Sequence, residues 1–376
     1  MDGHTGDVGL PTTSTIDYRR ARRARTALGA SVVVAAGLLA QAGGASAVAP
    51  GANGRIACEG GRALPGATVT NPEVFTINPD GTGELVLTDF PGRDGDPSWS
   101  PDGRTIAFES FRSGGSEVWT MNADGTGLTQ LTFNGPAEDR GTSWSPDGSR
   151  IAYHTTEFPA GAGHSSFEIM TMNADGTDKV RLTDNLVQDS LPSWSPDGTM
   201  IAFNSFRDGD HEIYVMGADG SNPTRLTSSP GEDAHPMWSP DGTQITFHTR
   251  RFGPLDVMVM NADGSGPRLV TTGTEATHEF FPVWSPDGTK IAFTGNTVNT
   301  GNFDVYTINL DGTGLFQVTD GPGFNGRCDW GRLSPVDKEE CKGSGYQRFS
   351  SATFERFRNQ GQCVSFVEAS EQAGRQ

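Results

Sequence analysis

Basic residues are scarce in this sequence. Its 376 residues include 28 lysines and arginines against 46 aspartates and glutamates, a formal net charge of −18. Nucleic acids and anionic membranes are bound through Lys and Arg, so the composition argues against both as partners. A cationic peptide, a sugar amine or a metal ion remains compatible with the charge.

Long hydrophobic runs are also missing. The one extended apolar run, residues 27–40, is too short to span a bilayer, and it follows five arginines in residues 19–25 and precedes an Ala-Ser-Ala site at 45–47. This order predicts a signal peptide over residues 1–47 and a secreted, periplasmic or cell-envelope protein. The general secretory route is favoured over the twin-arginine route because Arg25 stands where the latter signal has an apolar residue. An uncleaved anchor is the alternative.

Cysteine is rare, and familiar catalytic motifs are absent. The four cysteines all follow residue 47, and an even number in an exported chain predicts two disulfides with three possible pairings. The sequence has no G-x-S-x-G nucleophile elbow, no H-E-x-x-H zinc motif and no EF-hand loop. These absences leave binding as the simplest class of function.

A repeat dominates what is present. The motif Trp-Ser-Pro-Asp-Gly or a variant begins at successive tryptophans spaced by 45, 50, 44, 46 and 46 residues, and Asn-x-Asp-Gly or a variant accompanies each unit. The leading tryptophans are Trp99, Trp144, Trp194, Trp238, Trp284 and Trp330. A period near 45 residues without a helical pattern indicates one four-stranded sheet per repeat.

The two ends of the repeat array complete each other. Residues 53–58 already read as the second strand of a unit, whereas Trp330 ends a first strand that no second strand follows. We therefore predict an all-β, six-bladed β-propeller over residues 48–330, closed by pairing of its N- and C-terminal strands, which removes the exposed sheet edges. A monomer is expected.

Closure also predicts the cysteine pairing. If Trp99 lies opposite Ile106 across the turn, then Pro97 lies opposite Phe108. The matching positions in the closing blade are Cys328 and Cys58, which we expect to be bonded. Cys341 and Cys363 would then pair within a C-terminal tail, residues 331–376.

The repeated Trp-Ser-Pro-Asp-Gly with a trailing Asn-x-Asp-Gly resembles the TolB-type β-propeller repeat over residues 53–330. The resemblance implies a propeller and, by analogy with TolB, a periplasmic protein-binding role. Similar repeats form propellers in prolyl-oligopeptidase-like enzymes and some sugar lyases. The tail is similar to a short cysteine-containing motif at the ends of some secreted bacterial proteins, and a disordered extension is the alternative.

Comparison among the six repeats selects candidate binding positions. The position five residues before each tryptophan is acidic in five units and is expected near the channel mouth, where it would attract a cation or basic group. The alternative is that each acid holds a neighbouring loop. The column consists of Asp94, Asp139, Asp189, Asp233, Glu279 and Asn325.

The position three residues before each tryptophan varies, which favours binding over a role in the frame. It includes His235 and Arg327, and the other units have Asp96, Gly141, Leu191 and Phe281 there. His235, His278, Asp233 and Glu279 come from adjacent units and form a candidate metal site. Solvated loop histidines are the alternative.

A further acidic position precedes each third strand and is expected to hold loops, with Arg112 near Glu117 and Arg207 near Glu212. The turns after the first and third strands are short and nearly constant, whereas the other loops vary and share the opposite face, where we expect function.

The sequence thus favours an exported, non-catalytic propeller, with no required cofactor, that binds a protein, peptide or envelope glycan at its variable face and acidic channel mouth. The alternative is a carbohydrate-active lyase or hydrolase that uses a divalent metal at the His/Asp/Glu group.

Overall fold

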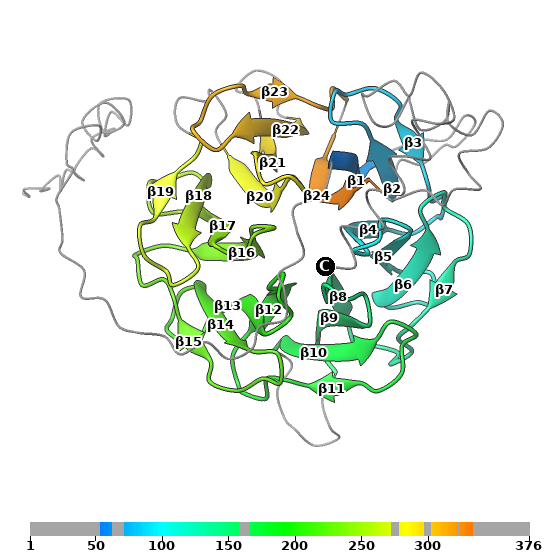
Figure 1. Ribbon diagram of the computed structural model, residues 1–376. Helices are drawn as coiled ribbons and strands as arrows, with labels where there is room; N and C mark the ends of the chain where they lie inside the picture. Colours follow the sequence, from blue (N-terminus) through cyan, green and yellow to red (C-terminus); the bar gives the residue numbers. More distant parts are fainter. Residues whose placement is uncertain are drawn as a thin grey trace, which may run out of the picture. The chain divides into compact units, whose positions relative to one another are not determined.

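A computed structural model describes residues 53–61, 71–157, 166–271, 278–296, 302–321 and 323–333. These residues form 24 β-strands in six four-stranded antiparallel sheets around a central axis (Figure 1). Within these ranges the chain has no helix long and apolar enough to cross a membrane. The predicted six-bladed propeller is confirmed.

Each blade uses its four strands in the same order from the centre outward (Figure 1). The inner strands are β4 (Asp94–Trp99), β8 (Asp139–Trp144), β12 (Asp189–Trp194), β16 (Asp233–Trp238), β20 (Glu279–Trp284) and β24 (Asn325–Arg332). The second strands are β5 (Thr105–Ser110), β9 (Arg150–Thr155), β13 (Met200–Ser205), β17 (Gln244–Thr249), β21 (Lys290–Asn296) and β1 (Asn53–Gly61).

The third strands are β6 (Glu117–Asn122), β10 (Glu168–Asn173), β14 (Glu212–Gly217), β18 (Asp256–Asn261), β22 (Phe303–Asn309) and β2 (Pro72–Ile77). The outer strands are β7 (Thr129–Gln130), β11 (Val180–Arg181), β15 (Thr224–Arg225), β19 (Arg268–Leu269), β23 (Phe316–Gln317) and β3 (Leu85–Val86).

The Ser-Pro-Asp-Gly segments form tight turns between inner and second strands. In the first of them the Gly103 N–H donates to the Ser100 carbonyl at 2.8 Å, and Gly103 has a φ of 67° that favours glycine. The Asp102 carboxylate accepts hydrogen bonds from the Ser100 hydroxyl and the Arg104 N–H. The repeated aspartates are therefore turn formers, as the repeat comparison predicts.

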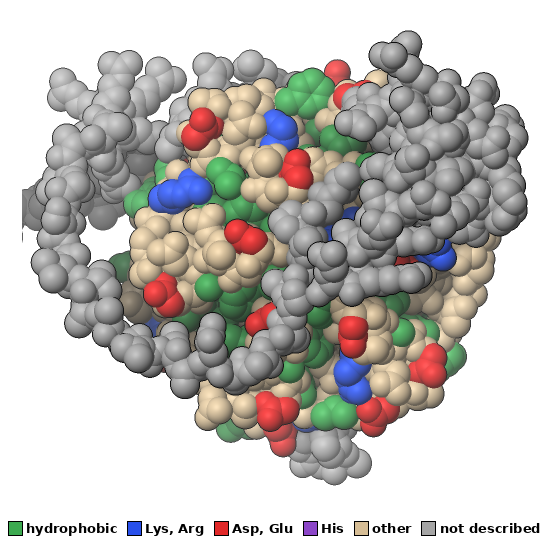
Figure 2. All heavy atoms as spheres, in the orientation of Figure 1, with side chains coloured by type: hydrophobic (Ala, Val, Ile, Leu, Met, Phe, Trp, Pro, Cys, Tyr) green, Lys and Arg blue, Asp and Glu red, His purple; other side chains and the backbone are tan. Residues whose placement is uncertain are grey.

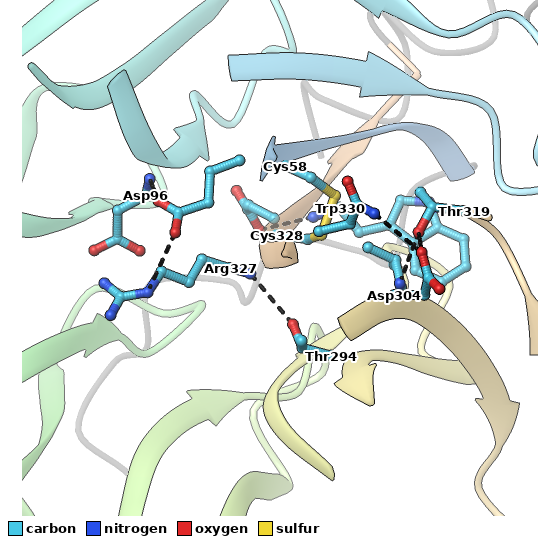
Figure 3. The surroundings of a disulfide bond; sticks show 12 residues. Cys58, Asp96, Thr294, Asp304, Thr319, Arg327, Cys328 and Trp330 are labelled. Atoms are coloured by element: carbon cyan, nitrogen blue, oxygen red, sulfur yellow. Dashed lines mark hydrogen bonds and ion pairs between the residues drawn. A yellow bond between two sulfur atoms is a disulfide. The ribbon is translucent and has the colours of Figure 1, made fainter. Parts of the chain in front are cut away.

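Strands from the two ends of the array close the ring. Strand β24 pairs antiparallel with β1, with Trp330 opposite Ile56, and the resulting sheet runs β24-β1-β2-β3. A disulfide joins Cys58 to Cys328 across this pair (Figure 3). Both the closure and this cysteine pairing are confirmed, and the bond links residues 270 positions apart.

Apolar side chains fill the space between neighbouring blades. One cluster joins Ile56 and Phe75 of the closing blade to Val283 and Val305 of the preceding one. The second strands contribute fully buried aromatic rings, including Phe108. Burying each such ring stabilises the fold by about 2 kcal/mol, so the blades form a firm frame for the inner strands.

Two sequence predictions fall outside the described residues. They are the signal peptide at 1–47 and the tail beyond residue 333 with its Cys341–Cys363 pair. Each of these stays a prediction.

Candidate functional site

A β-bulge interrupts every inner strand at the same place. In β4 the pairing with β5 shifts register between Gly95 and Ser98, and the other five inner strands shift equivalently. The residue three positions before each tryptophan then has a left-handed backbone. We call these residues the bulge ring: Asp96 (φ 50°), Gly141 (60°), Leu191 (55°), His235 (58°), Phe281 (53°) and Arg327 (45°).

The left-handed conformation costs a non-glycine residue about 1 kcal/mol. Five of the six positions nevertheless have a side chain, and all five of those residues are partly exposed while their strand neighbours are mostly buried. One backbone geometry thus presents different chemistry at each blade, and the variable column predicted from the sequence is this ring.

A second ring of buried polar side chains supports the bulges. Each member lies three residues after the isoleucine of its second strand, as Glu109 does after Ile106, and none is more than 5% exposed. We call it the support ring: Glu59, Glu109, His154, Asn204, His248 and Thr294. Sequence reasoning missed it, although the signal was a polar residue in an otherwise apolar strand.

Three support residues accept the N–H of the bulge residue in the next blade. Glu59 Oε2 accepts from Asp96 N at 3.1 Å, and His154 Nδ1 accepts from Leu191 N at 3.3 Å. Thr294 Oγ1 accepts from Arg327 N at 3.3 Å. These bonds satisfy backbone donors that the bulges remove from the sheet.

Gly141 is the one bulge position without a side chain, because His154 occupies the space. A Cβ at Gly141 would lie 2.5 Å from His154 Cε1. Burial lowers the pKa of His154 to about 3, so the ring stays neutral and can accept the Leu191 N–H through Nδ1.

One side of the channel is ionic. Arg93 bridges Glu59 at 2.7 Å and Glu109 at 2.6 Å, and Arg327 Nε lies 3.6 Å from Glu59. Figure 3 shows Asp96 and Arg327 beside the disulfide. Burial, followed by the nearby Asp96 charge, raises the pKa of Glu109 to about 7.

The facing side is aromatic. The Arg327 guanidinium lies 4.8 Å from the centroid of Phe281, and the Phe281 and His235 centroids are 5.1 Å apart. His235 stacks on His248 at 6.2 Å. Burial lowers the pKa of His235 to about 3, so this side has a neutral imidazole at any ordinary pH.

At the other end of the channel, every blade contributes the same residue, its leading tryptophan. A cavity of about 200 Å³ is lined by the six leading tryptophans together with repeat prolines such as Pro146 and Pro196. We call this the tryptophan end. Asp329 lies there, and its Oδ2 accepts the Trp99 N–H at 2.7 Å while burial raises its pKa to about 6. Ser143 performs the same function for Trp194.

The predicted acidic channel mouth needs correction. Asp94, Asp139, Asp189, Asp233, Glu279 and Asn325 are all 0% exposed. Three of them bind arginines: Asp94 holds Arg112 at 2.5 Å, Asp189 holds Arg207 at 2.7 Å and Asp233 holds Arg251 at 2.5 Å.

Each bulge adds one residue to its strand and so reverses the side to which the preceding side chains point. These carboxylates therefore point into the blades. The prediction that these acids form a solvent-facing ring is therefore wrong. A direct binding role for these six residues stays a prediction. On the described surface visible in Figure 2, acidic side chains are spread singly.

Two arginines pair with acids other than those predicted. Arg112 and Arg207 bind the acids of the inner strands instead of Glu117 and Glu212. Glu117 accepts the Thr132 hydroxyl at 2.5 Å, and Glu212 accepts that of Thr227 at 2.5 Å. The acids that begin these third strands therefore hold threonines that lie two residues beyond the fourth strands.

The predicted metal site is not assembled. Among the residues that the structure describes, no group of three histidine, cysteine, aspartate or glutamate side chains is arranged to hold a metal. Asp233 is engaged by Thr249 and Arg251, and His235 packs against His248 and Phe281. The set His235, His278, Asp233 and Glu279 does not form a ligand shell.

Solved structures share the fold at low identity. TolB from Acinetobacter baumannii is 21% identical with a TM-score of 0.64, over 74% of this chain and 66% of that one. A candidate TolB from Agrobacterium tumefaciens is 23% identical with a TM-score of 0.58, over 73% of this chain and 91% of that one.

An uncharacterised curated protein of Agrobacterium fabrum, Atu1656, is 35% identical over 60 residues, which cover 16% of this chain and a fifth of the relative. The match thus spans a small part of that protein. The family profile described as the TolB beta propeller domain matches residues 63–205 and 188–279, more than half of the sequence. The chain therefore belongs to the TolB β-propeller family.

Proposed function

We propose that this chain is an exported, non-catalytic and monomeric binding protein of the cell envelope, whose ligand contacts the bulge ring from the face with the variable loops. The observation that carries the proposal is the bulge ring itself. Six positions share one backbone geometry, yet they present an acid, a glycine, a leucine, a histidine, a phenylalanine and an arginine.

Backbone energetics support a binding role for these side chains. Glycine adopts the left-handed conformation without the penalty that other residues bear, so the frame alone would be served by glycine at every position. Leu191, His235 and Phe281 therefore add strain of about 1 kcal/mol each without building the blade. A ligand that contacts them accounts for their presence.

Export and envelope location rest on the predicted signal peptide, and a protein, peptide or glycan ligand rests on the TolB resemblance. The second candidate, a metal-dependent carbohydrate-active enzyme, would require convergent metal ligands. No such cluster is present among the described residues. We propose binding because the bulge ring supports it directly.

Ligand capture with matched variants tests the proposal. The triple variant Leu191→Gly, His235→Gly, Phe281→Gly removes side chains where glycine suits the backbone. The control, Pro146→Ala with Pro196→Ala, alters the tryptophan end. Envelope extract of the producing cell would be passed over each immobilised protein.

We expect the wild type and the proline control to retain the same ligand, and the glycine variant to retain at least tenfold less. Thermal unfolding establishes that all three are folded. Equal capture by the folded glycine variant would refute a binding role for the bulge ring.

A further inference from the structure

A pocket of about 280 Å³ lies beside the bulge ring, where three blades meet at β12–β13, β16–β17 and β20. We call it the junction pocket. One wall is polar and includes Asn204, His248 and Glu232. The other is apolar and includes Leu191, Phe280 and Phe281.

Two buried polar atoms in the polar wall have no hydrogen-bond partner. Asn204 is 2% exposed; its Nδ2 donates to Ser190 Oγ at 2.9 Å, but its Oδ1 is unpaired. His248 is 5% exposed, and its Nδ1 is also unpaired.

The other ring nitrogen of His248, Nε2, lies 3.9 Å from Glu232 Oε1, so its nearest carboxylate is on the side away from Nδ1. A buried polar atom without a partner costs about 1–3 kcal/mol. This wall is therefore suited to a ligand with several hydroxyls, because a hydroxyl both donates and accepts hydrogen bonds.

The carboxylate and the guanidinium in the pocket lining pair with each other. Arg250 Nε donates to Glu232 Oε2 at 2.8 Å. His211 also lines it, and burial lowers the pKa of that imidazole, which keeps it neutral. A charged ligand would have no counterion here, whereas a neutral one would leave the Glu232–Arg250 pair intact.

The apolar wall supplies aromatic rings. Phe280 and Phe281 meet edge to face with centroids 4.7 Å apart, and Leu191 adjoins them in the same lining. Aromatic faces pack well against the C–H groups of a saturated ring. A pyranose has such a face together with a rim of hydroxyl donors, and the cavity is large enough for one sugar unit.

We propose that the junction pocket binds a single neutral pyranose unit of a glycan, with hydroxyls hydrogen-bonded to Asn204 Oδ1 and His248 Nδ1 and a sugar face against one ring of the Phe280–Phe281 pair. This inference rests on the proposed function and narrows its ligand to a glycan. A tyrosine side chain fits less well because its single hydroxyl can satisfy only one of two unpaired atoms that come from separate blades.

The test uses methyl glycosides of glucose, galactose, mannose and N-acetylglucosamine as probes, with saturation-transfer NMR and calorimetry on the full chain. We expect saturable millimolar binding of at least one glycoside. The double variant Asn204→Ala, His248→Ala should weaken that binding at least tenfold.

Two further variants keep the result interpretable. Pro146→Ala with Pro196→Ala alters the tryptophan end, away from the junction pocket, and should bind like the wild type. Asn204→Thr introduces a threonine, the residue that the β20–β23 blade has at this position (Thr294). The variant should therefore fold and still lose affinity for the glycoside.

Absence of saturable binding at about 50 mM, well above the expected millimolar range, would overturn the inference, as would unchanged affinity in the folded Asn204→Thr variant. Preferential binding of tyrosine amide would do the same. If no glycoside binds while capture from envelope extract still depends on the bulge ring, the assignment of a sugar to the junction pocket is refuted. The proposed binding function is not refuted by that result.

Discussion

The two ends of the propeller channel are built from the same six strands but follow opposite rules. At the tryptophan end every blade contributes a leading tryptophan, and most add a proline and an Asp-Gly turn. Three residues earlier in each strand, every blade has the same bulge but a different side chain. Repeated residues therefore mark what builds a blade, and the column that changes within a fixed backbone marks what can recognise a ligand.

The contrast extends to the support ring. Glu59, Glu109 and Arg93 make one side of the channel ionic, whereas His235, His248 and Phe281 make the facing side aromatic. A six-fold frame thus produces a site without six-fold symmetry. The following changes separate the frame from the site.

The largest effect should come from opening the ring. Cys58→Ser with Cys328→Ser removes a crosslink between residues 270 positions apart. Loop-closure entropy predicts a loss of about 3–5 kcal/mol in the free energy of unfolding. Urea denaturation of the variant and of the oxidised wild type measures it. A loss below about 1 kcal/mol would show that strand pairing alone holds the closure.

The next effect tests whether the buried acids belong to the frame. Asp233→Ala leaves the Arg251 guanidinium, whose side chain is 13% exposed, without its partner. We expect a loss of about 3 kcal/mol in the free energy of unfolding. Glu138→Ala is the control, because Glu138 is 43% exposed where it pairs with Arg140, and it should cost less than about 1 kcal/mol. Equal losses in the two variants would contradict this account.

A pH-dependent effect is expected at the tryptophan end. The raised pKa of Asp329, about 6, means that the folded protein holds a proton that the unfolded chain releases above about pH 4. Stability contributed by the protonated form is present at low pH and is lost as pH rises through 6.

Asp329→Ser introduces the residue that other blades have at this position, such as Ser143. Well above pH 6 it should exceed the wild type by about 3 kcal/mol in the free energy of unfolding, and below pH 4 the two should match. Denaturation curves at pH 4 and pH 7.5 measure the difference. A constant difference at both pH values would exclude titration of Asp329 as its cause.

The smallest effect on stability is expected at the bulge ring. Leu191→Gly relieves a left-handed leucine, which offsets the loss of its partly buried side chain, so the free energy of unfolding should change by less than about 1 kcal/mol. Leu191→Ala keeps the backbone strain and serves as the comparison. Thermal melts that place the glycine variant well below the alanine variant would contradict the strain assigned to this position.

The fold could be predicted because its signals are local and repeated. Each Asp-Gly turn fixes one hairpin, and the missing first strand before Asn53 and the missing second strand after Trp330 together imply closure. The bulge could not be predicted, because one extra residue leaves no mark on composition or spacing. The acids such as Asp94 were therefore expected to face solvent at the channel mouth, whereas the structure buries them.

The site was predictable in part for the same reason. The variability of His235 and Arg327 was visible in the sequence and led to the bulge ring. Asn204 and His248 were missed because each lies inside an apolar strand motif, where alternation indicates a core position. The unpaired polar atoms of these two residues appear only when three blades are placed side by side.

One titration tests the central claim most directly. The ligand captured from envelope extract would be added to isotopically labelled protein while the imidazole and indole resonances are followed together. The account predicts that the signals of His211, His235 and His248 shift and saturate, while the indole N–H signals of the six leading tryptophans stay in place. Saturating shifts confined to the tryptophans would contradict it.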